Sequence, residues 1–166
     1  RLESHRDALT GLLNRRGLHP LLQEASDLPN CSSLLFVDLD GFKAVNDLAG
    51  HAKGDAVLCQ VAAAVQRSVR ANDSVARFGG DEFVIVLRAC DQSQAVAVAQ
   101  KIVDTIRHHE FSVDTHVFRI GASVGVRSFT SSADSADALL HDADAACYHA
   151  KRLGRGRVVV YGSTSG

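Results

Sequence analysis

Two adjacent acids follow a glycine pair near the middle of the chain, and their surroundings predict the tip of a β-hairpin. Val75–Phe78 and Phe83–Leu87 are short runs of β-branched and aromatic residues, which favour strands. The Gly79–Gly80 pair between them adopts positive φ at no steric cost, as a tight turn requires. The like charges of Asp81–Glu82 then repel each other directly after the turn. A cation, or a ligand carried on a cation, would relieve that repulsion, although acids at turns are also common as solvated surface residues.

A second acidic position ends the apolar run that starts at Ser33. A continuous apolar run predicts a central strand that is covered on both faces. Since side chains alternate along a strand, we expect Asp38 and Asp40 to face opposite ways, so that one of them belongs to a given site. We assign Asp38 to metal binding and Asp40 mainly to capping the short helix predicted over Phe42–Leu48. The other interpretation of Asp38 is a surface acid at a strand end.

The start of that short helix places backbone donors beside the acids. Phosphate oxygens bind to exposed amides at a helix N-terminus, which here belong to Gly41, Phe42 and Lys43. If the strand and the hairpin are neighbours, Asp38, Asp81 and Glu82 form a cluster of hard oxygen ligands. Such a cluster, without soft ligands, suits Mg²⁺ or Mn²⁺ that bridges nucleotide phosphates. Two such ions would activate an attacking hydroxyl and neutralise the charge of a departing pyrophosphate.

Three motifs of the chain match one known family. Gly79 to Phe83 reads Gly-Gly-Asp-Glu-Phe, which resembles, letter for letter, the signature loop of the GGDEF family, the diguanylate cyclases. Arg70-x-x-Asp73, five residues upstream, resembles the inhibitory-site motif of that family. Asp7-x-Leu-Thr-Gly-Leu-x-Asn-Arg-Arg resembles its N-terminal motif, and further matches in the family's order and spacing extend to Arg157. The resemblance covers nearly the whole chain.

The resemblance implies roles for the acids and for one arginine of the predicted site. It makes Asp38, the backbone carbonyl of Leu39 and Asp81 metal ligands for two Mg²⁺ or Mn²⁺ ions per active site. Glu82 would assist at the metal or the phosphates, and whether Asp81 also takes the proton of the attacking hydroxyl stays open. Arg77 resembles an arginine that stabilises the transition state, and its other interpretation is a cross-strand ion pair.

The resemblance also implies the contacts to substrate, which include the glycines of the signature turn. Asp55 resembles the acid that reads guanine, because a carboxylate accepts from the N1–H and the amine of guanine, a donor pair that adenine lacks. Its other interpretation is the N-cap of the long helix predicted from Ala56 to about Val69. Asn46 resembles the amide that completes base recognition. Lys151 and Arg155 resemble contacts to the β- and γ-phosphates, whereas alone they would indicate cations that favour a helix C-terminus.

Arg70 and Asp73 resemble the pair with which the family binds its product, cyclic di-GMP, and stops turnover. The guanidinium can bind a phosphate oxygen or a guanine edge, and the carboxylate can accept from the N1–H and the amine of guanine. Alone, the pair would be a capping ion pair that contributes little. Residues 93–104 have Lys101 as their one base, where the family carries a second arginine, so weaker inhibition is expected. Gly156 is a further departure, since asparagine is common there.

Composition bounds the class of protein. With 166 residues, the chain is long enough for one domain with one hydrophobic core. Its 18 Lys and Arg against 19 Asp and Glu give no basic excess for nucleic acid or for a membrane surface. No apolar run approaches the ~20 residues of a membrane span. The four cysteines are scattered without a C-x-x-C pair, which indicates reduced thiols in a cytosolic chain.

The order of the predicted elements suits an α+β sandwich, in which helices cover a mixed sheet. Further helices are predicted over residues 15–25, with Asn14 as the N-cap, 93–107 and 137–153, and further strands over 116–120, 122–129 and 157–161. Residues 1–6 are predicted to be the end of an incoming helix, and Gly121 and Gly125 to mark a bend or bulge. The resemblance implies a central five-stranded sheet like the palm of nucleotidyl cyclases and polymerases, with a ferredoxin-like core.

The function that the resemblance implies is diguanylate cyclase. Two GTP molecules, one on each of two domains that face each other across a two-fold axis, would condense to cyclic di-GMP and two pyrophosphates. Residues 1–162 would form the bacterial GGDEF domain and residues 163–166 a flexible tail. We also expect a cytoplasmic location within a larger membrane-associated or soluble signalling protein, whose upstream sensory or dimerisation region is missing from this chain.

Two other functions are kept open by the sequence. The first is a non-catalytic GTP-binding module that regulates an adjacent cyclic di-GMP phosphodiesterase domain, and loss of either acid from the signature loop would favour it. The second is a cyclic di-GMP receptor that works through Arg70 and Asp73 alone. It would be expected if the residues that contact GTP had been replaced. Both acids and the GTP contacts are present in this chain.

Overall fold

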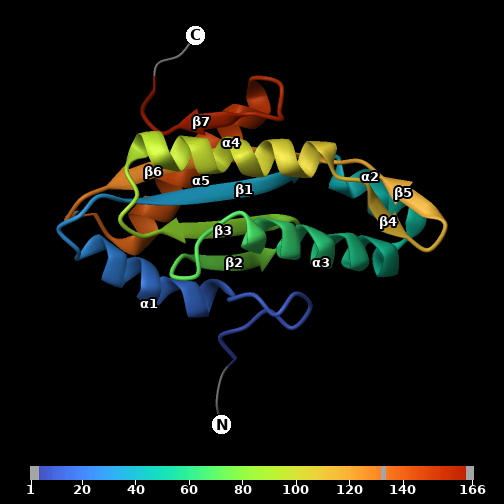
Figure 1. Ribbon diagram of the computed structural model, residues 1–166, viewed down its shortest axis with the longest axis horizontal. Coiled ribbons are helices and arrows are strands. Elements are labelled where there is room, and N and C mark those ends of the chain that lie inside the picture. The colour runs from blue at the N-terminus through green and yellow to red at the C-terminus, as the bar shows by residue number, and fades with distance from the viewer. Residues whose placement is uncertain (1–3, 132–133, 164–166) are drawn as a thin grey trace.

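The computed structural model, which describes residues 4–131 and 134–163, has a central sheet between two layers of helices (Figure 1). Within these residues, the sheet has five strands in the order β2-β3-β1-β6-β7. They are β1 (Ser32–Asp40), β2 (Ser74–Gly79), β3 (Glu82–Leu87), β6 (Gly121–Phe129) and β7 (Val158–Val160). β6 and β7 pair in parallel, and the other neighbours pair antiparallel. The predicted α+β fold with a mixed five-stranded sheet is confirmed.

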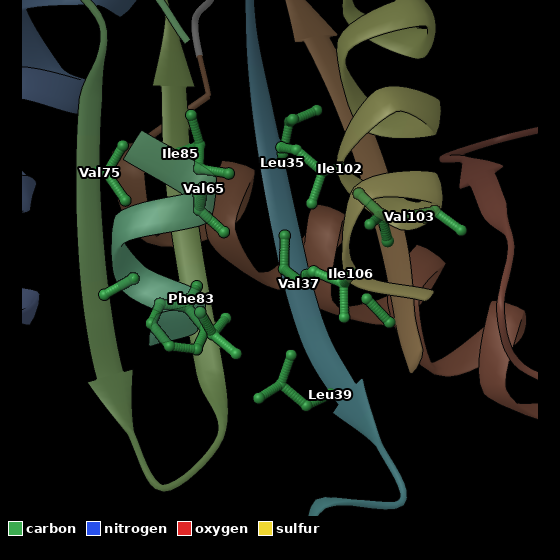
Figure 2. Close-up of a cluster of buried hydrophobic side chains, with 14 of the residues drawn as sticks. Leu35, Val37, Leu39, Val65, Val75, Phe83, Ile85, Ile102, Val103 and Ile106 are labelled. Atoms are coloured by element: carbon green, nitrogen blue, oxygen red, sulfur yellow. The ribbon is translucent and has the colours of Figure 1, made fainter. Parts of the chain in front are cut away.

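One face of the sheet is covered by α3 (His51–Arg67) and α4 (Gln92–His108). Side chains two residues apart along a strand share a face, and the odd-numbered residues of β1 point into this layer. Figure 2 shows them meeting side chains from β2, β3 and both helices. The labelled residues are Leu35, Val37, Leu39, Val65, Val75, Phe83, Ile85, Ile102, Val103 and Ile106.

The opposite face is covered by α1 (Arg15–Ser26) and α5 (Ala136–Arg152). The even-numbered residues of β1 and β3 supply this second core, together with the apolar stripes of the two helices. Its members include Leu18, Leu22, Leu34, Phe36, Val84 and Leu139. Side chains at even positions near the end of β1 are therefore directed toward α1 and α5, which decides the surroundings of the candidate site.

α5 lies directly against β6 because residue 125 is glycine. A Cβ on Gly125 would lie 3.0 Å from the carbonyl carbon of Ala146 and would overlap the backbone of Ala143 and Cys147. β6 pairs with β1 in one register from Gly121 to Phe129. The predicted bend or bulge at these glycines is therefore wrong, and the close approach of the helix explains the glycine at 125.

α2 (Phe42–Ala49) follows β1, and α3 follows α2 with Gly50 alone between them. The predicted start of the long helix at Ala56 is wrong, because α3 begins at His51. Asp55 therefore lies beyond the first turn of α3 and is not its N-cap. A glycine within the first turns of a helix weakens its propensity, which is why the pattern indicates a later start.

β4 (Phe111–Val113) and β5 (His116–Phe118) pair with each other in a separate two-stranded sheet. The strand predicted over 116–120 is thus correct in its first residues, whereas β4 was not predicted. The hairpin is bound to α3, since Nε2 of Gln60 donates to the carbonyl of Ser112 at 2.8 Å. It lies at one end of the molecule (Figure 1).

The N-terminal segment is held by contacts with the rest of the domain. Residues 4–6 are not helical, and Arg6 forms a β-bridge with Leu13. The predicted incoming helix is therefore wrong for these residues, and residues 1–3 lie outside the described part. Asn14 is the N-cap of α1, as predicted, and accepts from the Gly17 amide at 2.9 Å.

The predicted tail, residues 163–166, lies outside the described residues except for Ser163. In the described ranges, none of the helices has both the length and the apolarity needed to cross a membrane.

Candidate active site

The acids of β1 and of the hairpin meet at one edge of the sheet. β1 and β3 are neighbours, and Asp38 is the direct antiparallel partner of Glu82. The Leu39 amide donates to the carbonyl of Asp81 at 3.2 Å. The structure therefore brings Asp38, Leu39, Asp81 and Glu82 together, as the sequence predicts.

Asp38 and Asp40 face the same way, contrary to expectation, because the alternation along a strand has a period of two residues. The Nζ atom of Lys151 lies 3.2 Å from Oδ1 of Asp38 and 2.7 Å from Oδ1 of Asp40. The same ammonium donates to the Leu39 carbonyl at 3.0 Å. The prediction that one of the two acids belongs to the site is wrong, since both contact Lys151.

Asp40 does not cap α2. The N-cap of α2 is Gly41, without a side-chain hydrogen bond. The Asp40 carboxylate instead accepts from the Ser123 hydroxyl at 3.0 Å and from the Gly156 amide at 2.9 Å. Nε of Arg155 lies 4.0 Å from the same carboxylate. Asp40 thus fixes the segment after α5 beside the end of β1, which brings both predicted phosphate contacts to the acidic edge.

Negative charge is crowded at this edge. Burial raises the pKa of Asp38, the ammonium of Lys151 opposes that effect, and the charge of Asp81 adds to it. Burial also raises the pKa of Glu82, and the charges of Asp38, Asp144 and Asp81 raise it further. Desolvation and mutual repulsion therefore destabilise the ionised forms of these carboxylates in the folded chain.

We expect Glu82→Gln to raise the free energy of unfolding near neutral pH. Because the pKa of Glu82 is raised in the folded state, its charge destabilises the fold above that pKa. The penalty is lost as pH falls through the raised pKa toward the value of the unfolded chain, below which both states are protonated. Thermal unfolding in chelator, followed from about pH 4 to about pH 8, should show the largest gain in Tm at neutral pH.

The matched control for this experiment is Glu110→Gln. Glu110 is an exposed carboxylate that pairs with Arg119 at 3.1 Å on the surface, so its removal should change Tm little at any pH. A gain for Glu82→Gln that persists undiminished at acidic pH would contradict the electrostatic explanation.

The oxygen atoms of the site suit a hard divalent cation. Oδ1 of Asp38 and the carbonyl of Leu39 already converge on one cation, the Lys151 ammonium. Within the described residues, no three side chains of His, Cys, Asp or Glu are grouped closely enough to hold a metal by themselves. Mg²⁺ is usually held by one or two carboxylates together with substrate phosphates. The donor set with Asp81 therefore fits a cation that arrives with a nucleotide.

Arg77 connects the signature turn to the N-terminal segment. Gly79 and Gly80 form the turn with φ of 145° and 48°. Nε of Arg77 donates to the Gly80 carbonyl at 3.0 Å, and its Nη1 donates to the Asp7 carboxylate at 2.9 Å. The ion pair of Arg77 is therefore not cross-strand, because Asp7 lies outside the hairpin. Its effect on the transition state stays a prediction.

The residues predicted to read the base lie at the corner between α2 and α3. Asn46 is half-buried and Asp55 is exposed. The Asn46 side chain lies against Gly54, the residue before Asp55. Gly41 alone separates α2 from β1, so the first amides of α2 lie next to the acidic edge. Lys43 is exposed, whereas the side chain of Phe42 is buried, which leaves the backbone of Phe42 for a ligand.

Arg70 and Asp73 lie apart from this edge, on a separate cavity of about 210 Å³. The side chain of Asp73 is 1% exposed, and its carboxylate accepts from the backbone amide, Nε and Nη2 of Arg70 and from the Arg88 amide. These four bonds use the acceptor capacity of a carboxylate. Asp73 therefore positions the Arg70 guanidinium, which is 53% exposed, and the geometry leaves Arg70 to contact a ligand.

Two contributors to the site were missed by the sequence interpretation. Ser123 donates to Asp40, and a serine within a strand carries no signal for such a contact. Asp7 holds Arg77, and its place in the N-terminal motif was a usable signal. Both contacts join residues that are distant in the chain, with separations of 83 and 70 residues.

Comparisons with known proteins agree on one family. The sequence model described as "Diguanylate cyclase, GGDEF domain" matches residues 4–157. The probable diguanylate cyclase DgcE of Escherichia coli is 42% identical over 159 residues, which are 93% of this chain and 14% of that protein. The bifunctional diguanylate cyclase/cyclic di-GMP phosphodiesterase MucR of Pseudomonas aeruginosa is 41% identical over 153 residues, 90% of this chain and 22% of that protein. The chain thus spans less than a quarter of either relative.

A solved structure shows the same architecture. The GGDEF domain of DgcB from Caulobacter crescentus, in complex with c-di-GMP, superimposes with a TM-score of 0.90 at 28% identity. The match covers 98% of this chain and 99% of that one.

Proposed function

The chain belongs to the GGDEF family of diguanylate cyclases, and on that premise we propose that it condenses two GTP molecules into cyclic di-GMP and two pyrophosphates. The observation that carries the proposal is the pairing of β1 with β3, which places Asp38 opposite Glu82 and Leu39 beside Asp81 in an intact signature loop. Each 3′-hydroxyl would attack the α-phosphate of the other GTP. One domain then holds half of the active site, and the enzyme acts as a homodimer.

Substrate binding would use the corner of α2 and α3 and the end of α5. Asp55 and Asn46 would read guanine, and the first amides of α2 would bind phosphate oxygens. Lys151 and Arg155 would contact the β- and γ-phosphates. To do so, the Lys151 ammonium would exchange Asp38 and the Leu39 carbonyl for phosphate oxygens and keep Asp40, its shorter ion pair at 2.7 Å.

The proposed cofactor is Mg²⁺ or Mn²⁺, two per active site, which would activate the attacking hydroxyl and neutralise the charge on pyrophosphate when bound. The ligands of these ions would be Asp38, the Leu39 carbonyl and Asp81, and Glu82 would assist. The proton of the attacking hydroxyl must leave as the new bond forms, and an acid of the hairpin, Asp81 or Glu82, would accept it. Arg77, held by Asp7 and the signature turn, would stabilise developing negative charge.

The test is incubation of the protein with GTP and Mg²⁺, followed by chromatography of the nucleotides. We expect cyclic di-GMP, with two pyrophosphates for each molecule formed. The similarity to the bifunctional MucR supports a phosphodiesterase domain next to this one. A second candidate function is therefore a GTP-binding module that regulates such a domain and does not itself turn GTP over. Recovery of unchanged GTP from a protein that binds it would favour that second candidate.

We expect the rate per molecule to depend on protein concentration. If each domain carries one GTP, turnover requires two domains to meet, so specific activity rises with concentration until dimers saturate. Initial rates over a dilution series, with sedimentation of the same samples, measure this dependence. Constant activity per molecule in a protein that stays monomeric throughout would exclude the two-domain mechanism.

We also expect inhibition by the product through the exposed guanidinium of Arg70. A ligand bound there leaves the GTP contacts free, so inhibition should be non-competitive with GTP. The ligand would act by holding two domains in an arrangement in which their halves of the active site cannot meet. Wild-type progress curves should bend over as cyclic di-GMP accumulates. Arg70→Ala should make them linear and leave the initial rate nearly unchanged. Asp73→Asn should also relieve inhibition, because the carboxylate positions the guanidinium.

The matched control for product inhibition is Arg67→Ala, which removes an exposed arginine from the last turn of α3. It should keep the curvature of the wild-type progress curves. Calorimetric titration with cyclic di-GMP provides the decisive measurement, since equal binding to wild type and Arg70→Ala would leave the pair with a structural function alone.

A further inference from the structure

Gly54 has no side chain at the point where α2 and α3 meet, and the Asn46 side chain fills the space. A Cβ on Gly54 would overlap Oδ1 of Asn46, would lie 3.0 Å from its Cγ and would lie 3.3 Å from Cζ of Phe42. We propose that Gly54 is a positioning residue for base recognition, because its bare backbone holds the Asn46 amide beside Asp55. The inference rests on the proposed function of Asn46 in reading guanine.

The backbone conformation gives no reason for a glycine at this position. Gly54 is within α3 and is buried, and its φ is not in the left-handed region. Glycine inside a helix is less favourable than alanine, because it loses more conformational freedom on folding. The close approach of the Asn46 side chain is therefore the feature that requires glycine here.

Of the groups around Gly54, the Asn46 amide is the one that can move. Phe42 is 5% exposed and belongs to the core between the sheet and α3. The backbone of Asn46 is fixed, because its carbonyl accepts from the Gly50 amide at 2.9 Å. The Gly54 amide donates in turn to the Gly50 carbonyl at 3.1 Å. A methyl group at 54 would therefore turn the half-buried amide of Asn46 away and leave the fold in place.

Displacement of this amide would affect one ligand chemistry. The Asp55 carboxylate accepts hydrogen bonds, whereas an amide both donates and accepts. The two side chains together can match a base that carries donors and acceptors on the same edge, as guanine does. Adenine also carries a donor and an acceptor, but it lacks the donor pair that would anchor a base to the Asp55 carboxylate. It is then not held where the Asn46 amide could contact it, so its affinity should not depend on the position of the amide.

The test compares binding of 3′-deoxy-GTP and 3′-deoxy-ATP, which lack the attacking hydroxyl and cannot be turned over. Gly54→Ala and Asn46→Ala should each weaken binding of 3′-deoxy-GTP by about three- to tenfold, as expected for one lost hydrogen bond. The double variant should bind no more weakly than either single variant, because both changes remove the same contact. Binding of 3′-deoxy-ATP should stay at the wild-type level throughout.

Ala52→Ser is the matched control, since it also adds one heavy atom to α3, at an exposed position, and should bind both nucleotides like the wild type. A loss for Asn46→Ala without a loss for Gly54→Ala overturns the inference and leaves the proposed function standing. Failure of the wild type to bind 3′-deoxy-GTP overturns the proposed function, and the base-recognition role of Gly54 with it.

A nucleotide-free measurement tests the displacement itself. The side-chain amide resonance of Asn46, identified by its absence from the Asn46→Ala spectrum, should shift in Gly54→Ala and stay in place in Ala52→Ser. An unmoved resonance in Gly54→Ala overturns the inference. If Gly54→Ala does not fold, the double variant should restore folding because the colliding amide is gone, and a double variant that also fails to fold contradicts the proposal.

Discussion

Asp81→Ala and Asp38→Ala should each reduce formation of cyclic di-GMP by at least ~10²-fold, the scale of other lost electrostatic stabilisers in active sites. Each change removes a hard oxygen ligand from the edge where β1 and β3 meet, so phosphate charge in the transition state is left uncompensated. Initial rates at saturating GTP and Mg²⁺, compared at one protein concentration, measure the loss.

The fold should survive both changes, because neither acid is the main anchor of this edge. In the Asp38 variant, the Lys151 ammonium keeps Asp40 and the Leu39 carbonyl. Cooperative thermal unfolding confirms that each variant is folded. Asp104→Ala, which removes a half-exposed acid paired with Arg107 on α4, is the matched control and should keep the wild-type rate. Near-normal activity in a folded Asp81→Ala protein would remove the hairpin from the mechanism.

Asp55→Ala should weaken GTP binding by roughly 2–3 kcal/mol, the range for a charged group that loses its hydrogen-bonding partner. ATP binding should hardly change, since adenine lacks the donor pair that the carboxylate accepts. Since Asp55 is exposed and lies beyond the first turn of α3, no cap is lost, and Tm should stay close to that of the wild type. Calorimetric titration with 3′-deoxy analogues of both nucleotides measures the selectivity.

The control for Asp55 is Asp47→Ala, which removes an exposed acid from the neighbouring helix α2. It should alter neither affinity nor selectivity. Equal weakening of GTP and ATP by Asp55→Ala would show that the carboxylate acts through general electrostatics and does not read the base.

The elements of this fold that depend on neighbouring residues could be predicted from the sequence. The apolar run of β1, the glycine turn between β2 and β3 and the N-cap Asn14 each reflect interactions within a few residues. Their positions agree with the structure. The start of α3 was misjudged, because Gly50 and Gly54 weaken the local helical pattern, and the packing of Asn46 that explains Gly54 is not visible locally.

The sequence by itself determined the family, the order of the elements and the residue types at the acidic edge, since motifs and periodicity are properties of nearby residues. The tertiary structure decided which of those residues touch. Lys151 donates to the carbonyl of Leu39, which is 112 positions away in the chain. Asp40 accepts hydrogen bonds from Ser123 and Gly156 and does not cap α2. Such contacts arise from the order of strands in the sheet and from the helix that covers each face, and neither is encoded in local spacing.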